Sequence, residues 1–502
     1  MKSTFILPWF VLLWAAFGCQ STADDSMEPT KPNILFLFAD DLSYETIGAL
    51  GYEKVHTPHL DRLVNMGTTF THTYNMGGWN GAICVASRSM LISGRYLWEA
   101  QEMANRWGQG DSTALEQTWG RLMAQAGYDT YMSGKWHVRA PSSHVFDTVR
   151  HERPGMPPDA WGKGGGGKGV SDAIKNGGDV AAAMPVGYNY PRSREDKSWD
   201  PTDTTFGGFW SGGQHWSEVV RDDGMNFIHQ AAEKENPFFM YLAFNAAHDP
   251  RQAPQEFLDQ YPVNDIPVPE NYLEVYPDYD KIGLGPGLRD EALAPFPRTE
   301  YAVQKHRQEY FALITHMDEQ IGQILDALES SGQMENTYIV FTGDHGLSVG
   351  HHGLLGKQSM YDHSMRVPFI VTGPGVPPGE QRDQAIYLQD VMPTSLEWAD
   401  VKIPDYVDFH SITRLLQEPE ADSPYPEVYG AYMNIHRMVV SGDYKLIVYP
   451  TINTVKLYNL AEDPQEIHNL ADLPEYGKKV EEMKGKLHQL MEDMDDPLDA
   501  SL

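Results

Sequence analysis

Cysteine is scarce in this chain, whose 502 residues include only Cys19 and Cys84. Two cysteines can form no more than one bridge, so a small fold held together by a disulfide framework is excluded. The length instead allows a large hydrophobic core, and one big domain with a smaller one fits it better than three equal ones. Stability must therefore come from packing.

Basic residues are also in short supply, with 38 Lys and Arg against 70 Asp and Glu and a formal net charge of -32. Binding to nucleic acid requires lysine and arginine to meet the phosphates, so no nucleic-acid partner is expected. The acidic exterior keeps the protein soluble and would repel a bulk polyanion. Any anionic substrate must therefore enter a local cationic pocket.

The apolar stretch near the N-terminus, residues 5–17 after Lys2, is too short to be a stable membrane span. It predicts a signal peptide over residues 1–18 and an exported protein. The sequence Ala-Phe-Gly before Cys19 resembles a bacterial lipobox. This resemblance implies a lipid on Cys19, a polar tether over 19–30 and a periplasmic or membrane-anchored lipoprotein at the bacterial cell envelope; ordinary signal cleavage is the alternative.

Five apolar runs predict buried strands of one parallel sheet: 34–38, 128–133, 238–244, 338–341 and 367–371. Helical patterns lie between them, at 118–126, 217–233 and 305–330. This alternation predicts an α/β fold over residues 31–405, with a large, mostly parallel sheet sandwiched by helices. Ligands of such sheets bind beyond the carboxyl ends of the strands.

Three further segments depart from this alternation. Residues 151–201 and 261–298 are rich in Pro and Gly or in Pro, Tyr and Asp, and we expect them to be loops over the active edge of the sheet. After about residue 405 the chain shows four short runs, 428–432, 437–440, 444–449 and 455–458, and then a helical pattern over 476–494. These predict a C-terminal α+β subdomain, residues 406–502, with a short antiparallel sheet and a helix.

Asp40 and Asp41 follow the first predicted strand directly. Adjacent carboxylates repel each other unless a cation lies between them, and oxygen ligands select a hard ion such as Ca²⁺ or Mg²⁺. Asp344 follows another strand and could complete the site. A turn with a helix cap is the simpler interpretation of the Asp-Asp pair alone.

Cys84 begins the sequence Cys-Val-Ala-Ser-Arg, which continues Ser-Met-Leu-Ile-Ser-Gly-Arg. A helix starting near Cys84 would place Arg88 one turn on, over the same face. An anionic ester held there would meet the positive end of the helix, free N–H groups and a guanidinium. The alternative is a buried thiol with Arg88 in an ordinary ion pair.

The Cys84 sequence resembles the activation motif of the formylglycine-dependent (type I) sulfatases, within the alkaline-phosphatase-like superfamily, although Ala86 stands where Pro is commonest. The resemblance extends from about residue 31 to residue 470, and the chain resembles exported bacterial carbohydrate sulfatases in particular. It implies that a formylglycine-generating or anaerobic sulfatase-maturing enzyme converts Cys84 to formylglycine. It also implies a calcium ion, with these ligands: Asp40, Asp41, Asp344, His345 and the modified Cys84.

The same resemblance implies roles for further residues. Arg88, Lys135 and Lys357 would neutralise the sulfate, His137 would act as a base, and His248 would protonate the leaving alcohol. Lys135 and His137 are two apart in a segment predicted to be extended, so we expect them on the same side. Surface placement is the simpler interpretation of each of these residues taken singly.

The substrate implied is a sulfated carbohydrate, such as an oligosaccharide of algal polysaccharide, or a small sulfate ester. Five residues are candidates for holding it: Arg251, Trp210, His215, Trp216 and His436. Arg251 would bind a second acidic group, and the tryptophans, unless they are core residues, would stack on sugar rings. Two alternatives remain: a phosphoester or phosphonate ester hydrolase of the same superfamily, and a non-catalytic glycan-binding lipoprotein with Cys84 unmodified.

Overall fold

A sheet of nine strands forms the centre of the computed structural model, which describes residues 31–52, 54–157, 161–162, 165–188 and 191–498, together with Met1 and Thr4. The rest of the predicted signal peptide, Cys19 and the tether that ends at residue 30 lie outside the described residues. Residues 31–502 cluster as one unit, separate from residues 1–30.

Eight strands of this sheet lie in one continuous order, and the ninth pairs beside them. The order is β11 (Glu380–Arg382), β2 (Thr68–Tyr74), β10 (Arg366–Thr372), β9 (Thr337–Gly343), β1 (Asn33–Ala39), β8 (Phe238–Ala243), β4 (Asp129–Lys135) and β5 (Thr148–Arg153), with β12 (Ile386–Tyr387) beside β2. β9, β1, β8, β4 and β5 run parallel to one another. Four of the five predicted strands belong to this parallel set.

The fifth predicted strand, β10, is antiparallel to both of its neighbours, β9 and β2, so the prediction of a parallel strand is wrong here. Its connection from β9 holds only short turns of helix, at His351–Gly353 and at α12 (Asp362–Met365). A parallel return needs a long crossover, usually a helix, to carry the chain back along the sheet. Without one, β10 starts at the edge where β9 ends, and residues 344–365 stay at that edge.

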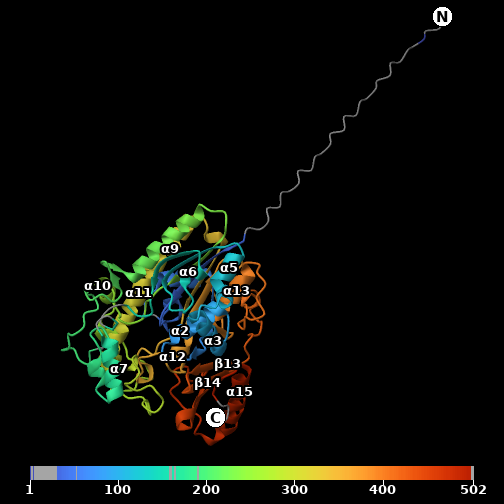
Figure 1. Cartoon of the computed structure of the whole chain (residues 1–502). Helices are drawn as coiled ribbons and strands as arrows, with labels where there is room; N and C mark the ends of the chain where they lie inside the picture. The colour runs from blue at the N-terminus through green and yellow to red at the C-terminus, as the bar shows by residue number, and fades with distance from the viewer. Residues whose placement is uncertain are drawn as a thin grey trace. The chain divides into compact units, whose positions relative to one another are not determined.

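Helices cover both faces of the sheet, as predicted (Figure 1). Alternate residues of β1 point to opposite faces: Leu35 and Leu37 pack in one hydrophobic cluster, and Phe36 and Phe38 in another. The first cluster includes residues of α1 (Pro58–Met66), α9 (Trp216–Ala232) and α11 (Glu300–Ser330). The second includes residues of α2 (Ile83–Ser93), α3 (Leu97–Gly108), α5 (Trp119–Gln125) and α13 (Val391–Trp398).

A second sheet near the C-terminus has the four predicted strands, β13 (Val428–Tyr432), β14 (His436–Ser441), β15 (Tyr444–Tyr449) and β16 (Thr454–Asn459), followed by α15 (Gly477–Asp493). A short strand from far earlier in the chain, β3 (Gly77–Gly78), pairs in parallel with β13. A β carbon on Gly77 would lie 2.0 Å from the carbonyl oxygen of Ala431, so this approach requires glycine. The segment that leads into α2 is therefore joined to the C-terminal sheet.

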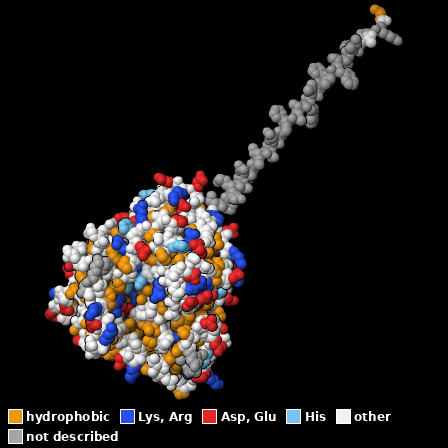
Figure 2. Space-filling model, viewed as in Figure 1, with side chains coloured by type: hydrophobic (Ala, Val, Ile, Leu, Met, Phe, Trp, Pro, Cys, Tyr) orange, Lys and Arg blue, Asp and Glu red, His pale blue; other side chains and the backbone are white. Residues whose placement is uncertain are grey.

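The two insertions contain little regular structure. Residues 151–201 include α7 (Gly166–Asn176) and α8 (Val180–Ala183), and residues 261–298 include only short 3₁₀ turns among the described residues. The remaining short helices are α4 (Ser112–Glu116), α6 (Ser142–Val145), α10 (Gln255–Leu258) and α14 (Thr413–Gln417). Within the described chain, no helix combines the length and apolar character needed to cross a membrane. Figure 2 shows acidic and basic side chains interspersed over the face that it draws.

Candidate active site

Four neighbouring parallel strands deliver polar residues to one edge of the large sheet. Lys135 is the last residue of β4, Asp40 and Asp41 follow β1, and Asp344 follows β9. His248 comes five residues after the end of β8. The ligand atoms of Asp40, Cys84, Asp344 and His345 all lie within 4.8 Å of one another, and so do those of Asp40, Asp41 and His248. The structure thus brings together residues that are far apart in the sequence.

Cys84 is the second residue of α2, whose N-cap is Ala82. Its Sγ lies 3.3 Å from Nδ1 of His137. One turn on, Arg88 is fully buried; its Nε donates to Oδ2 of Asp344 at 2.9 Å and its Nη1 to the carbonyl oxygen of Lys135 at 2.9 Å. Its Nη2 has no hydrogen-bond partner among the described residues. The ion pair of Arg88 therefore leaves donor capacity for a ligand.

Two buried lysines pair with the two aspartates. Nζ of Lys135 donates to Oδ2 of Asp40, and Nζ of Lys357 donates to Oδ1 of Asp41 at 2.7 Å. All four side chains are shielded from solvent. A buried charge without a partner is costly, so each pair holds its members at the sheet edge.

His345 is oriented in a way that suits a metal ligand. Its Nδ1 donates to the carbonyl oxygen of Gly346 at 2.9 Å, which leaves Nε2 as the nitrogen available to a ligand. Nε2 lies 3.4 Å from carboxylate oxygens of both Asp41 and Asp344, and it has no hydrogen-bond partner within the described chain, like Oδ1 of Asp40. Several acceptors facing one another repel unless a cation lies between them, so these residues fit a bound cation, and their oxygens favour a hard one.

The electrostatics of the site favour an anion at Cys84. Burial opposes ionisation of the Cys84 thiol, but Lys135, His137 and Lys357 outweigh it and hold the pKa of Cys84 well below its usual value. Any negative group at this position would gain from the same cations. Burial lowers the pKa of His248 to about 4, although Asp41 and Asp249 oppose the shift, so this imidazole is neutral at pH 7 before a ligand binds.

A pocket of about 190 Å³ opens onto these residues. It is lined by Gly81, Ala82, Cys84, His137, Gly155, Met156, His248, Leu288, Arg289, Asp290, Lys357 and Gln358. Both insertions contribute, with Gly155 and Met156 from the first and residues 288–290 from the second. Their predicted place over the active edge is therefore confirmed for these parts of them. Arg289, Asp290 and Gln358 were missed by the sequence reasoning, because their loops carry no periodic pattern, although Gln358 adjoins the predicted Lys357.

One detail of the Lys135 prediction needs correction. β4 ends at Lys135, and His137 has a φ of 56°, in the left-handed region, so the segment is not extended there. The chain turns after the strand, and this turn, rather than strand alternation, brings His137 to Cys84 while Lys135 reaches Asp40. The two side chains share the site for a reason that the sequence did not reveal.

The five residues predicted to hold the substrate do not line this pocket among the described residues. Arg251 is buried, donates to the carbonyl oxygen of Ala247 and lies over the ring of Tyr310. Its predicted contact with a second acidic group of the substrate stays a prediction, and Arg251 is not among the described residues that line this pocket.

The other four residues also make contacts within the protein. His215 caps α9 by accepting from the backbone N–H of Ser217, Trp216 packs in the core, and Trp210 pairs with His215 in a short hairpin of β6 (Trp210–Ser211) and β7 (Gln214–His215). His436 is buried and donates from Nε2 to the carbonyl oxygen of Ile282 at 2.9 Å. His215, Trp216 and His436 are buried and Trp210 is half-buried, and the predicted substrate contacts of all four stay predictions.

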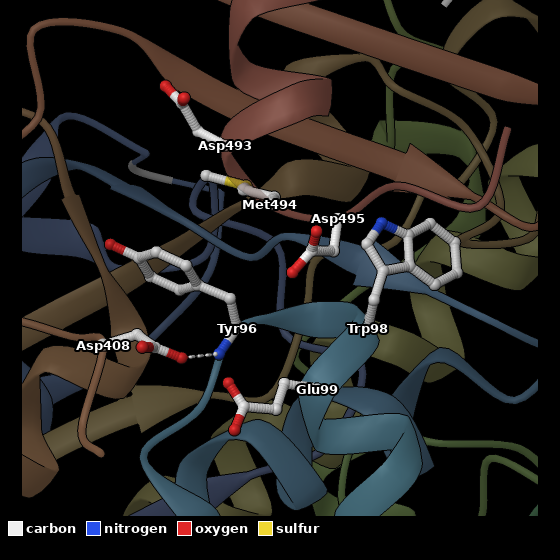
Figure 3. A pocket seen from close by; sticks show the side chains of 7 residues that line it. All are labelled: Tyr96, Trp98, Glu99, Asp408, Asp493, Met494 and Asp495. Atoms are coloured by element: carbon white, nitrogen blue, oxygen red, sulfur yellow. Dashed lines mark hydrogen bonds between the residues drawn. The ribbon is translucent and has the colours of Figure 1, made fainter. Parts of the chain in front are cut away.

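A separate hollow lies between the C-terminal end of α15 and the start of α3 (Figure 3). It is lined by Tyr96, Trp98, Glu99, Asp408, Asp493, Met494 and Asp495. Its four carboxylates would repel a sulfate ester, and none of the predicted site residues lines it. The pocket at Cys84 is therefore the candidate active site.

The family model described as "Sulfatase" matches residues 32–401. The chain belongs to the sulfatase family. A second model, described as "N-sulphoglucosamine sulphohydrolase, C-terminal", matches residues 350–493 of this sulfatase. As a member of the family, the protein is a sulfuric ester hydrolase.

Curated relatives match this sulfatase along most of its length. A protein named "Sulfatase" from Formosa agariphila is 28% identical over 480 residues, covering 92% of this chain and 87% of its own. The N-acetylglucosamine-6-O-sulfatase of Bacteroides thetaiotaomicron is 26% identical over 567 residues, covering 98% and 90%. The ulvan-active sulfatase of Formosa agariphila is 25% identical over 516 residues, covering 99% and 89%.

Solved structures share the fold. One, determined in complex with its substrate D-glucosamine-2-N,6-O-disulfate, has a TM-score of 0.68 at 22% identity and covers 94% of this chain and 100% of its own. The phosphonate monoester hydrolase of Silicibacter pomeroyi has a TM-score of 0.67 at 20% identity, covering 92% and 95%. Fold likeness alone therefore does not separate the two kinds of ester.

Proposed function

We propose that this sulfatase hydrolyses sulfate esters of carbohydrates, with Cys84 converted to formylglycine and a calcium ion bound beside it. The observation that carries the proposal is the position of Cys84, at the start of α2 and within 4.8 Å of the ligand atoms of Asp40, Asp344 and His345. Support for a carbohydrate substrate comes from relatives named for N-acetylglucosamine 6-O-sulfate and for ulvan, which match nearly the whole chain.

The metal and the modified residue would each supply one kind of chemistry. Asp40, Asp41, Asp344 and His345, with the residue at position 84, would hold calcium, which acts as a Lewis acid toward sulfate oxygens. Formylglycine would supply a hydrated aldehyde, with one hydroxyl to attack sulfur and a second through which the sulfate is released. An unmodified Cys or Ser has no such second hydroxyl.

The cationic side chains bind and orient the ester. Arg88 has an unpaired Nη2 among the described residues, and Lys135 and Lys357 lower the pKa of the group at position 84. These charges are fixed by buried ion pairs with Asp344, Asp40 and Asp41 before the substrate arrives. Charge that grows on the sulfate oxygens is thus met by groups that need little reorganisation.

Two histidines would move protons in this reaction. Nδ1 of His248 donates to the carbonyl oxygen of Asp249 at 2.7 Å, so Nε2 is left to exchange a proton with the leaving oxygen. An anionic ester would favour the protonated ring, which is neutral in its absence. His137 contacts the atom at position 84 and would remove a proton there.

Mass analysis of the peptide spanning residues 82–88, combined with rates on matched esters, tests the proposal. Conversion of Cys84 removes its sulfur, and the converted fraction should correlate with turnover of sulfate esters. Hydrolysis rates are also measured on 4-nitrophenyl phosphate and on a phosphonate monoester. Faster hydrolysis of either than of 4-nitrophenyl sulfate would favour the phosphoester or phosphonate alternative, and binding of sulfated glycan without turnover would favour the non-catalytic one.

We further propose that the protein is exported through the N-terminal signal and that Cys19 carries lipid. Residues 5–17 and the sequence before Cys19 support this. Cell fractionation with a Cys19→Ala variant tests it: the wild type should be in the membrane fraction and the variant in the soluble periplasmic or secreted fraction. Equal distribution of the two would overturn the lipid assignment.

A further inference from the structure

The pocket contains polar side chains that the sulfate chemistry does not use. Of the described residues that line it, Cys84, His137, His248 and Lys357 have roles at the sulfur centre. The remaining side chains are small or apolar except for three: Arg289, Asp290 and Gln358. These three are the groups available to recognise the alcohol part of the ester.

The three side chains form one connected wall. Arg289 donates from Nη1 to Oδ2 of Asp249 at 2.5 Å and from Nη2 to Oδ1 of Asp249 at 3.2 Å, and it also pairs with Oδ1 of Asp290 at 2.5 Å. Oδ2 of Asp290 accepts from Nε2 of Gln358 at 2.7 Å, and that nitrogen also donates to the carbonyl oxygen of Gly81 at 2.8 Å. We call Asp249, Arg289, Asp290 and Gln358 the polar wall.

The polar wall connects two segments that carry proposed catalytic residues. Its Asp249 end adjoins His248, which faces the leaving oxygen, and its Gln358 end contacts the segment that leads into Cys84. Every member is held by a neighbour before a substrate binds, so little side-chain entropy is lost on binding. Met156 and Leu288 supply the apolar surface beside it.

The charge of the polar wall is negative, because two carboxylates surround a single guanidinium. Arg289 is already paired with both carboxylates, and despite the opposing effect of burial it holds the pKa of Asp249 well below its usual range, with His248 and Arg251 acting in the same direction. A further carboxylate on the substrate would meet these charges at close range and find no unpaired cation in the wall. Hydroxyl groups, in contrast, can donate to the remaining lone pairs of Asp290.

We infer that the polar wall binds the alcohol part of the substrate and selects sugars without a carboxylate, that is, neutral or amino sugar sulfates rather than sulfated uronic acids. The inference rests on the proposed function, because it assumes that the alcohol is a sugar. It assigns Arg289, Asp290 and Gln358 as specificity-determining residues.

Competition against 4-nitrophenyl sulfate tests the inference without requiring that the cleaved position be known. The competitors are methyl glucoside and methyl glucuronide esters that carry sulfate at the same ring position. We expect the wild type to bind the neutral ester at least about tenfold more tightly, because like charges placed side by side at a binding surface are strongly unfavourable. Equal binding, tighter binding of the glucuronide, or no competition by either ester would overturn the inference.

The variant Asp290→Asn removes one charge of the polar wall while keeping its size. Its preference for the neutral ester should fall to about threefold or less. Asp265→Asn, an exposed position of the same insertion, is the matched control and should keep the wild-type preference. If Asp290→Asn lowers the thermal midpoint strongly, the wild-type comparison still decides the matter.

The outcome is distinguishable from failure of the proposed function. If the enzyme cleaves 4-nitrophenyl sulfate but no sugar sulfate, while the neutral esters still compete better, the carbohydrate proposal fails and the selectivity stands. If sugar sulfates are cleaved with no difference between neutral and carboxylate-bearing rings, the proposed function stands and the inference fails.

Discussion

The imidazole of His137 occupies the space that a side chain at Gly155 would need. A β carbon built on Gly155 would lie 2.2 Å from Cε1 and 2.4 Å from Nδ1 of His137. Nδ1 is also the atom that contacts Sγ of Cys84 at 3.3 Å. The absence of a side chain at Gly155, in the first insertion, therefore leaves room for the imidazole that contacts Cys84.

We expect Gly155→Ala to displace the His137 ring from Cys84 and lower kcat/KM by about 10²-fold, since small misplacements in an active site have effects of this size. Gly81→Ala is the matched control, because it adds a methyl group to the same pocket with only Oη of Tyr432 within 4 Å, at 3.8 Å. The loss should depend on the ring: Gly155→Ala should add little in a His137→Ala background. Full additivity would contradict the relationship.

Cys84→Ala should reduce turnover by about 10⁴-fold or more, as removal of a nucleophile does, while the thermal midpoint stays close to that of the wild type. The side chain replaced is small and its neighbours are held by other contacts. Cys84→Ser should be as inactive in a host that does not convert serine. Near-normal activity of either variant would exclude residue 84 as the nucleophile.

Asp344→Asn should weaken calcium binding by at least about tenfold, as loss of a charged group at a metal site does. Titration calorimetry on chelated protein measures the affinity, with the exposed Asp405→Asn as control. Chelation should lower activity, and calcium should restore it better than zinc. Full activity of metal-free protein, verified by elemental analysis, is the contrary result.

His248→Ala should lose about 10²–10⁴-fold on a sugar sulfate and much less on 4-nitrophenyl sulfate, whose leaving group needs little protonation. Since the pKa of His248 is lowered to about 4, the protonated fraction grows as the pH falls from 7 toward 4. The wild-type ratio of kcat/KM for sugar ester to aryl ester should therefore rise over this range. An equal loss on both substrates, with a flat ratio, would remove His248 from the acid role.

His436 should make the fold sensitive to acid. Burial lowers its pKa to about 4, whereas the unfolded chain has the ordinary value of about 6.5. Between these values the unfolded state binds a proton that the native state does not, so stability is complete above pH 6.5 and falls by up to about 3 kcal/mol as the pH approaches 4.

Urea unfolding at pH 7.5 and pH 5 measures this contribution. The difference between the two midpoints should be smaller for His436→Gln than for the wild type, even though the variant is less stable at pH 7.5. His468→Gln, at an exposed position, is the control and should leave the difference unchanged. A wild-type difference that survives in His436→Gln would assign the acid sensitivity to other groups.

The sequence predicts those parts of the fold in which the residue types and the hydrophobic pattern indicate the same structure. Strand β1 is a continuous apolar run, so the strand was predictable. Asp40 follows it directly, so the edge of the sheet that carries the site was predictable as well. The direction of β10 was not predictable, because it depends on a connection from β9 that lacks a long helix. Burial of Arg251 was not either: a long polar side chain after a strand reads the same in sequence whether it faces a ligand or Tyr310.

Specificity was the least predictable feature. Arg289 and Asp290 lie in an insertion without periodicity, and only the fold brings them to the pocket that Cys84 also lines. The residues at the sulfur centre were accessible because strand ends converge; those of the polar wall come from loops whose course is set by tertiary contacts.

The pairing of β3 with β13 also affects the order in which the protein can fold during its synthesis. The segment before Cys84 has to wait for its partner strand until the ribosome has added roughly 350 more residues, which takes about 20–70 s at 5–20 residues per second. Until β13 is made, this pairing of the segment before Cys84 cannot form; in the completed protein only 2% of Cys84 is exposed. If Cys84 is converted to formylglycine as proposed, the order of synthesis would favour conversion before the C-terminal sheet is complete.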